Sequence, residues 1–321
     1  MTNQAPLTNL DQVNNLQIKN NDKPLFFILG PCVIESEMHT LKMAESLANL
    51  SAKLKFSFIF KSSFDKANRT SLENFRGMGL KRGCKILEKV GREFDVPVIT
   101  DIHEPRQAEI VAEYVDVLQI PAFLCRQTDL LVAAGKTGKT INLKKGQFTA
   151  PESMEKAVKK IASTGNEKIW LCERGYTFGY SNLVVDYRNF PIMKSFGYPV
   201  VFDATHSVQR PSIQGCSSGG DRSFIPHLAA AAVAQRIAGI FMEVHDNPAA
   251  ALCDGPNSVP LNRLEELLQY LIELDLWVKS RPYPKLSANQ DSANRDSASE
   301  QTPDQAKTIP SSHRDQVERV A

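Results

Sequence analysis

The chain has 321 residues, 42% of them hydrophobic and 23% charged, which is enough for one large domain or two ordinary ones. Its 38 lysines and arginines nearly balance its 36 aspartates and glutamates, so nothing indicates nucleic acid as an obligatory partner. No apolar run approaches the roughly 20 residues that span a bilayer, and residues 1–6 lack the features of a secretory signal. We therefore expect a soluble cytoplasmic protein without a membrane partner.

Short apolar runs alternate with longer amphipathic stretches from residue 21 to residue 280, after a polar lead-in over residues 1–20. The runs are rich in Ile, Val and Phe, as strands buried on both faces should be. The predicted strands cover residues 25–29, 56–61, 96–102, 115–120, 140–144, 168–173, 200–205 and 239–245. The predicted helices cover residues 41–54, 80–94, 107–114, 128–134, 153–162, 222–237 and 261–278.

Eight strands alternating with helices predict a single-domain (β/α)₈ TIM barrel of the α/β class over residues 21–280. The rival is an open doubly wound sheet, which usually has a glycine-rich loop after its first strand. Here that turn reads GPCVIES from Gly30, which is not such a loop. Residues 281–321 contain almost no large apolar side chain, so they are expected to be a disordered tail, with an interaction role as the alternative.

The reactive side chains collect where the predicted strands end, which is where barrels carry their chemistry. Several of them are cations, and cations that converge on one barrel mouth repel one another unless anions lie between them. The pattern therefore favours phosphate and carboxylate substrates, although each residue alone is equally well read as a solvated loop residue. The cationic set is Lys61, Lys66, Arg69, Arg126, Lys144 and Arg174.

A second set is able to bind a metal ion: Cys32, His206, Glu243 and Asp254. A thiolate, an imidazole and two carboxylates suit one divalent ion such as Zn²⁺, Fe²⁺ or Mn²⁺. The spacing is long and no local motif supports the set, so Cys32 alone is better read as an inert small hydrophobe. His103 and His245 are alternatives on pattern. The other five cysteines show no grouping and no CxxC pair, and we expect Cys84 and Cys172 to be core residues.

Six stretches of the sequence resemble the 3-deoxy-D-manno-octulosonate 8-phosphate synthase family. The resemblance is nearly collinear over about residues 25–278. The stretches are FKSSFDKANRTS at 60–71, TDIHEP at 100–105, QIPAFLCRQTD at 119–129, NLKKGQF at 142–148, ERGYTFGYSNLVVD at 173–186 and FDATHS at 202–207.

The resemblance implies a homotetrameric barrel enzyme, a transferase that condenses phosphoenolpyruvate with D-arabinose 5-phosphate. C3 of the enol attacks the aldehyde carbon, water adds at C2, and inorganic phosphate leaves by C–O cleavage. The product, 3-deoxy-D-manno-octulosonate 8-phosphate, feeds lipopolysaccharide synthesis. Both substrates are anionic, in agreement with the cationic set.

The resemblance also implies residue roles. Phosphoenolpyruvate is expected at the lysines and arginine of the mouth, and the pentose phosphate at the loop after the second strand. Arg126 is expected to reach the site of a neighbouring subunit. The implied substrate-binding residues are Lys61, Lys66, Asn68, Arg69, Thr70, Gln119, Pro121, Ala122, Arg126, Lys144, Gln147 and Arg174, and the implied catalytic residues are Lys66, His206 and Asp254.

The family has a metal-dependent branch with cysteine at the position of Cys32 and a metal-independent branch with asparagine there. Cys32 therefore implies one divalent ion held together with His206, Glu243 and Asp254, whereas the CDGP loop from Cys253 resembles the other branch. The nearest rival is the related synthase that uses erythrose 4-phosphate, which usually has KPRT where this chain has KANR at 66–69. A non-catalytic barrel that binds sugar phosphates is the rival from another class.

Overall fold

The computed structural model describes residues 21–69, 71–179, 182–214 and 217–284, without the side chains of 211–218. The predicted lead-in at 1–20 and the tail from residue 285 onward lie outside these ranges, so both stay predictions. Among the described residues no helix combines the length and the hydropathy that crossing a bilayer requires.

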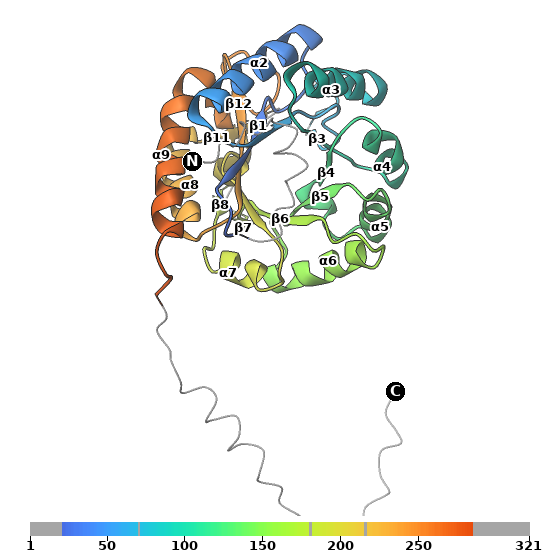
Figure 1. The fold of residues 1–321 in the computed structure, drawn as a ribbon. Coiled ribbons are helices and arrows are strands. Elements are labelled where there is room, and N and C mark those ends of the chain that lie inside the picture. The colour runs from blue at the N-terminus through green and yellow to red at the C-terminus, as the bar shows by residue number, and fades with distance from the viewer. Residues whose placement is uncertain (1–20, 70, 180–181, 215–216, 285–321) are drawn as a thin grey trace, which may run out of the picture. The chain divides into compact units, whose positions relative to one another are not determined.

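Strands and helices alternate along the chain (Figure 1). The strands are β1 (Phe26–Gly30), β2 (Phe58–Lys61), β3 (Val98–Asp101), β4 (Val117–Ile120), β5 (Thr140–Lys144), β6 (Ile169–Glu173), β7 (Tyr176–Thr177), β8 (Leu183–Val184), β9 (Val200–Asp203), β10 (Gln209–Gln214), β11 (Ser217–Gly220), β12 (Gly239–His245) and β13 (Val259–Pro260). The helices are α2 (Glu37–Leu54), α3 (Leu80–Phe94), α4 (Pro105–Ala112), α5 (Thr128–Lys136), α6 (Met154–Ala162), α7 (Asn189–Lys194), α8 (Ile225–Ala234) and α9 (Leu261–Lys279).

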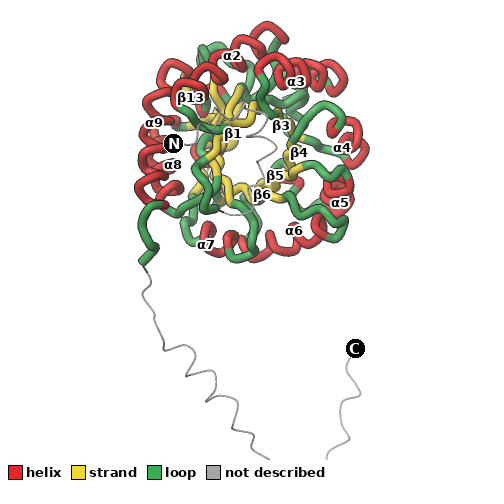
Figure 2. The backbone as a smooth tube through the Cα atoms, viewed as in Figure 1, coloured by secondary structure: helices red, strands yellow, loops and turns green. Residues whose placement is uncertain are grey.

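Eight of these strands form a closed parallel barrel. Their order is β1-β2-β3-β4-β5-β6-β9-β12, and β1 pairs with β12 to close the ring, with Phe26 opposite Gly239 and Gly30 opposite Glu243. The strands form the inner ring and the helices the outer ring (Figure 2). This confirms the (β/α)₈ barrel, and each predicted strand coincides with an observed one to within about two residues at either end.

Local sequence explains why the elements begin and end where they do. The hydroxyl of Ser36 caps α2 by accepting a hydrogen bond from the amide of His39, which satisfies an otherwise free donor of the first turn. Helices α2 and α3 both end at left-handed residues, Lys55 and Asp95, each three positions before the first residue of the next strand. Helices that end in this way, shortly before the next strand, return the chain to the same end of the barrel.

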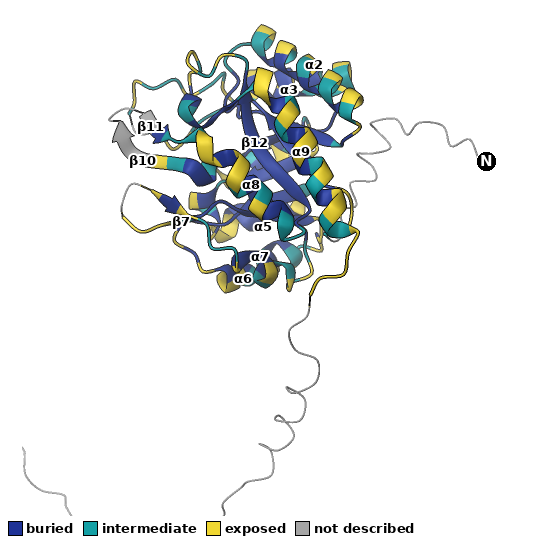
Figure 3. Ribbon diagram, turned by 90° about the vertical axis from the view of Figure 1, so that its left-hand side faces the viewer, coloured by how far each residue is buried: buried dark blue, intermediate teal, exposed yellow. Residues whose placement is uncertain are grey.

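The interior of the barrel has two layers made by alternate residues of the same strands. The lower layer, at the amino ends, is apolar: Phe26, Ile28, Ile59, Ile99, Val117, Trp170, Cys172, Val201, Ala238 and Phe241 pack together there. A larger apolar cluster fills the space between the sheet and the helices. Figure 3 shows the buried strands behind helices whose outer faces are exposed.

Between β6 and α8 the structure contains elements that were not predicted from the sequence. β7 and β8 form a hairpin after β6, β10 and β11 form another after β9, and α7 follows the first. α7 has six residues, too few for a helical period to appear in the sequence. Helix α2 also begins four residues before its predicted start at Leu41, because Ser36 caps its first turn.

Candidate active site

The carboxyl ends of the barrel strands carry a buried layer of charged and amide side chains. β1 approaches β2 so closely there that a Cβ atom on Gly30 would lie 2.0 Å from the Lys61 carbonyl oxygen. Gly30 also has a φ of +153°, which L side chains rarely adopt. This glycine therefore allows the turn that carries Cys32 to lie against the end of β2.

Lys61 lies at the centre of one half of the layer and is 1% exposed. Its ammonium donates hydrogen bonds to the Ser63 hydroxyl at 2.9 Å and to the Cys32 carbonyl at 3.2 Å, and lies 3.8 Å from Asp101. Ser63 and Gln119 both donate hydrogen bonds to Asp101. Burial alone would raise the pKa of Asp101, but the charge of Lys61 helps hold that pKa well below its usual range.

Lys144 lies in the other half of the layer, with its ammonium 2.6 Å from the Asp203 carboxylate and 4.0 Å from the centre of the Phe241 ring. Burial would lower the pKa of Lys144, but the neighbouring Asp203 raises it. Burial would raise the pKa of Asp203, but His206 and Lys144 lower it. The lysine is therefore protonated and the aspartate ionised at neutral pH.

His206 has its two ring nitrogens in different surroundings. Nδ1 lies 2.7 Å from Asp203, whereas Nε2 lies 3.4 Å from Glu243 and 3.7 Å from Asp254. A carboxylate on Nδ1 keeps the proton there and leaves Nε2 with a free lone pair. Metal-binding histidines commonly have this arrangement.

Glu243 is fully buried, and neither of its carboxylate oxygens has a hydrogen-bond partner within the described part of the chain. Its nearest cations are the ammonium groups of Lys61 and Lys66, at 3.7 and 3.8 Å, too far for hydrogen bonds. A buried carboxylate without hydrogen bonds is strongly destabilising. The free oxygens next to Nε2 of His206 therefore fit a metal ion.

The four predicted metal ligands divide into two overlapping groups of side chains. His206, Glu243 and Asp254 have ligand atoms within 4.8 Å of one another, and so do Cys32, Cys253 and Asp254. Nε2 of His206 lies 3.4 Å from Glu243 and 3.7 Å from Asp254, and the Cys32 sulfur lies 3.4 Å from Asp254, and one ion can bridge atoms at these separations because Zn–N and Zn–O bonds are about 2.0–2.2 Å long and Zn–S bonds about 2.3 Å. Asp254 belongs to both groups and so connects Cys32 with His206 and Glu243, while one ion held by all four predicted ligands stays a prediction.

The expectation that Cys253 lies apart from the other reactive side chains is wrong. Its sulfur lies 2.8 Å from that of Cys32, because the loop after β12 folds back over the end of β1. Sequence separation hid this contact, since the two residues are 221 positions apart. Cys84 and Cys172 are buried in the core as predicted.

A third group of ligand-type side chains, Glu35, His39 and His245, also has its atoms within 4.8 Å of one another. Nδ1 of His245 accepts a hydrogen bond from the Asn247 amide at 3.0 Å, and Nε2 lies 3.3 Å from Glu35. Both nitrogens of His245 are thus engaged by the protein. Glu35 also accepts from the Leu252 amide at 2.8 Å, so this group joins two loops rather than forming a metal site.

The remaining predicted substrate residues surround this centre at different depths. Arg174 is buried and donates to the His206 carbonyl at 2.8 Å and to Gln209 at 2.7 Å. Gln147 is buried too, and its Oε1 has no hydrogen-bond partner among the described residues. Arg69 donates to two backbone carbonyls, those of Phe75 and Leu252.

Other predicted positions lie at the edge of the site. Asn68 is exposed, Pro121 is half-buried and Ala122 is buried. Thr70 lies outside the described residues. Arg126 is exposed and is not part of the buried layer, so its role at a neighbouring subunit stays a prediction.

Asp101, Asp203 and Asn142 complete the layer, and no role was predicted for them. Asn142 donates to Gln119 at 2.8 Å, while the two aspartates hold the lysines. A signal was present in the strand period: Asp101 follows Ile99 and Asp203 follows Val201 by two positions. A polar residue two positions after an interior apolar one faces the same side of a strand.

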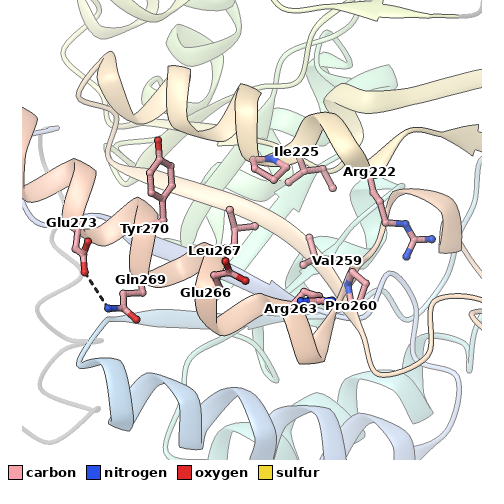
Figure 4. Close-up of a pocket in the computed structure, with 11 residues that line it drawn as sticks. Arg222, Ile225, Val259, Pro260, Arg263, Glu266, Leu267, Gln269, Tyr270 and Glu273 are labelled. Atoms are coloured by element: carbon pink, nitrogen blue, oxygen red, sulfur yellow. Dashed lines mark hydrogen bonds between the residues drawn. The ribbon is translucent and has the colours of Figure 1, made fainter.

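A separate cavity of about 630 Å³ lies away from this layer, between α8, β13 and α9. Figure 4 shows Tyr270 and Leu267 of α9 along one wall and Ile225 of α8 along another, with Gln269 donating a hydrogen bond to Glu273. None of the predicted site residues lines it. The charged layer at the barrel mouth, not this cavity, is therefore the candidate active site.

Comparisons with known proteins match the whole barrel. A sequence model of the DAHP synthetase I family matches residues 8–280. A protein of Trichlorobacter lovleyi named 2-dehydro-3-deoxyphosphooctonate aldolase is 60% identical over 255 residues, which cover 79% of this chain and 94% of that protein. Proteins of the same name from Cyanothece sp. (59% identical over 252 residues, 78% and 92% covered) and Francisella tularensis subsp. holarctica (54% over 275 residues, 86% and 100% covered) are also similar.

Proposed function

The chain belongs to the DAHP synthetase I family and, within it, to the proteins named 2-dehydro-3-deoxyphosphooctonate aldolase, and on that premise we propose the reaction it catalyses. That name and 3-deoxy-D-manno-octulosonate 8-phosphate synthase denote one enzyme. The chain condenses phosphoenolpyruvate with D-arabinose 5-phosphate and water, giving 3-deoxy-D-manno-octulosonate 8-phosphate and inorganic phosphate. It is a transferase of lipopolysaccharide precursor synthesis.

The observation that carries the proposal is the convergence of Lys61, Lys66, Lys144 and Arg174 on one barrel mouth. Lys61 and Lys144 lie deepest, each beside an aspartate. Lys66 is more accessible, and although burial would lower its pKa, the neighbouring carboxylate of Glu243 helps to raise it. These four cations suit a small substrate that carries both a phosphate and a carboxylate.

Phosphoenolpyruvate is held, in this proposal, by the four cations together with Gln119, Gln147 and the backbone at Pro121 and Ala122. Arg174 is anchored by two hydrogen bonds of its terminal nitrogen, and its Nε has no partner among the described residues. That nitrogen is therefore available to an anion. A guanidinium fixed in this way pre-orders the site, because little side-chain entropy is lost on binding.

D-arabinose 5-phosphate is placed at the loop after β2, with its phosphate at Asn68, Arg69 and Thr70. Arg69 is supported there by the Phe75 and Leu252 carbonyls, at 2.9 and 2.8 Å. In a homotetramer the exposed Arg126 would reach this phosphate from the neighbouring subunit. The pentose aldehyde would then point inward, toward Lys66 and the enol carbon.

The residues present fit one divalent ion, held by Cys32, His206, Glu243 and Asp254. When bound, such an ion acts as a Lewis acid and a template for the aldehyde or the water nucleophile. Asp203 keeps Nε2 of His206 directed toward Glu243 and Asp254. Lys66, 3.8 Å from Glu243, is placed to hold or deliver a proton as the new bond forms, and with His206 and Asp254 it makes up the proposed catalytic group. We place the enzyme in the cytoplasm, where both substrates are expected.

The test is phosphate release from phosphoenolpyruvate by purified protein with D-arabinose 5-phosphate, with erythrose 4-phosphate as the control aldose. We expect turnover with the pentose, loss of turnover after chelation and recovery with Zn²⁺, Fe²⁺ or Mn²⁺. Turnover that survives complete metal removal would contradict the metal site but not the reaction. Turnover with erythrose 4-phosphate alone, or with neither aldose, would contradict the proposed function.

A further inference from the structure

Cys253 is not one of the four proposed metal ligands, but it lies in contact with one of them, Cys32. It is 5% exposed and precedes Asp254, and its thiol and that of Cys32 are hydrogen-bonded at 2.8 Å. The Cys32 thiol also donates to Asp254 at 3.4 Å. Three ligand-type groups therefore meet at one point, two of them sulfurs.

The loop that carries Cys253 is held in one conformation. Asp254 has a left-handed backbone (φ 47°, ψ 30°), which is uncommon for a residue other than glycine and is maintained only by its surroundings. The Asp254 carbonyl accepts hydrogen bonds from the amides of Asn257 and Ser258 at 3.0 and 3.1 Å. On the other side of Cys253, the Leu252 amide donates to Glu35. These contacts fix the backbone on both sides of the thiol.

The two sulfurs are close enough for one ion to bind both. Zn–S bonds are about 2.3 Å long, so an ion can contact sulfurs up to about 4.6 Å apart. Asp254 is within 4.8 Å of both sulfurs and also belongs to the group with His206 and Glu243. An ion that binds Cys32 and Asp254 thus lies within reach of Cys253.

We propose that Cys253 is a second thiolate ligand of the metal ion, so that the site binds thiophilic divalent ions such as Zn²⁺ in preference to Mn²⁺. The inference rests on the proposed function only in taking the ion to be at Cys32. Two thiolates favour soft and borderline ions, whereas carboxylates favour hard ones. Binding converts both thiols to thiolates, and the two protons pass to the solvent.

The first test is a Co²⁺ titration of the metal-free, reduced protein, followed by the sulfur-to-cobalt charge-transfer absorbance. We expect Cys253→Ser and Cys32→Ser each to give about half the wild-type absorbance per bound Co²⁺, with one proton fewer released on binding. Cys84→Ser, which alters a buried thiol remote from the site, is the matched control and keeps the full absorbance. Full absorbance and unchanged proton release in Cys253→Ser would overturn the proposal.

The second test is competition between Zn²⁺ and Mn²⁺ for the same proteins. We expect Cys253→Ser to lose at least tenfold of the wild-type preference for Zn²⁺, and an unchanged preference would also overturn the proposal. Cys253→Ala serves in both tests if the serine variant does not fold. Phosphate release separates this inference from the proposed function. If the wild type releases phosphate and Cys253→Ser keeps the full cobalt absorbance, only the second thiolate ligand is contradicted. If Cys253→Ser has half the absorbance but the wild type releases no phosphate, only the proposed reaction is contradicted.

Discussion

The apolar lower layer and the charged upper layer of the barrel interior come from the same strands, two residues apart. Ile99 packs in the apolar layer and Asp101 lies in the charged one, and Phe241 and Glu243 stand in the same relation on β12. Both members of each pair are buried. A shift of two positions along a strand therefore separates a side chain that packs in the apolar core from one that contributes a charge to the site.

The comparison shows that the apolar lower layer strengthens the interactions between the charges of the upper layer. It excludes water from below, so the charges interact in a medium of low polarity and their partners shift the pKa values strongly. The ring of Phe241 illustrates this, since it belongs to the apolar cluster and faces the Lys144 ammonium from 4.0 Å. We expect changes in the upper layer to affect activity most and changes in the lower layer to affect stability most.

The largest effect is expected from removing a charge of the upper layer. Lys61→Met should lower kcat/KM by about 10³-fold or more, because a fixed charge is lost where an anionic substrate reacts. The free energy of unfolding should also fall by about 3 kcal/mol, since Asp101 keeps a buried charge without its lysine. Steady-state phosphate release and urea unfolding measure the two effects.

The matched control for this change is Lys53→Met, which removes an exposed lysine of α2 that pairs with Glu265 at 2.6 Å. Exposed ion pairs contribute about 1 kcal/mol or less, so activity and stability should barely change. A folded Lys61→Met enzyme with a tenth or more of the wild-type kcat/KM would show that the lysine does not hold the substrate.

The next effect is expected in the lower layer, at Trp170, whose ring centre lies 4.9 Å from that of Phe26. Trp170→Ala should reduce the free energy of unfolding by about 3–5 kcal/mol, because it leaves a cavity. The conservative Trp170→Phe should lose less. Both should keep the KM for phosphoenolpyruvate within about threefold, measured below their unfolding temperatures. A tenfold change in KM with unchanged stability would show that the two layers do not have separate roles.

The fold was predictable from the sequence because its signals are local. Each barrel strand is a short apolar run, and the helix of residues 80–94 shows its period clearly, with Ile86, Leu87 and Val90 on one buried face. The hairpins and α7 were not predictable, because their lengths are too short for a period. The start of a helix depends on a single capping residue such as Ser36, which the apolar period of the sequence does not reveal.

The candidate site was predictable in part, for a different reason. Cations such as Lys61 and Lys144 end strands, so the barrel prediction alone placed them at one mouth. The pairing of Lys61 with Asp101 and of Lys144 with Asp203 is visible only in the three-dimensional structure. Cys253 was missed because its contact with Cys32 joins loops at opposite ends of the chain, and no local pattern reports such a contact.

The smallest of the expected effects tests whether the charges of the upper layer are stabilised as pairs. The pKa of Asp203 is lower in the folded chain than the unfolded value of about 3.9, so its ionised form stabilises the fold above that pH and the stabilisation is lost as the pH falls toward the folded pKa. Asp203→Asn should therefore be less stable than the wild type at pH 7, and should lose about 1 kcal/mol less between pH 7 and pH 3. Urea unfolding at both pH values measures this, with Asp129→Asn, an exposed carboxylate of α5, as the control that leaves the pH dependence unchanged. An Asp203→Asn protein as acid-sensitive as the wild type would mean that Lys144 and His206 do not stabilise the aspartate, and the upper layer would then be an assembly of independent charges.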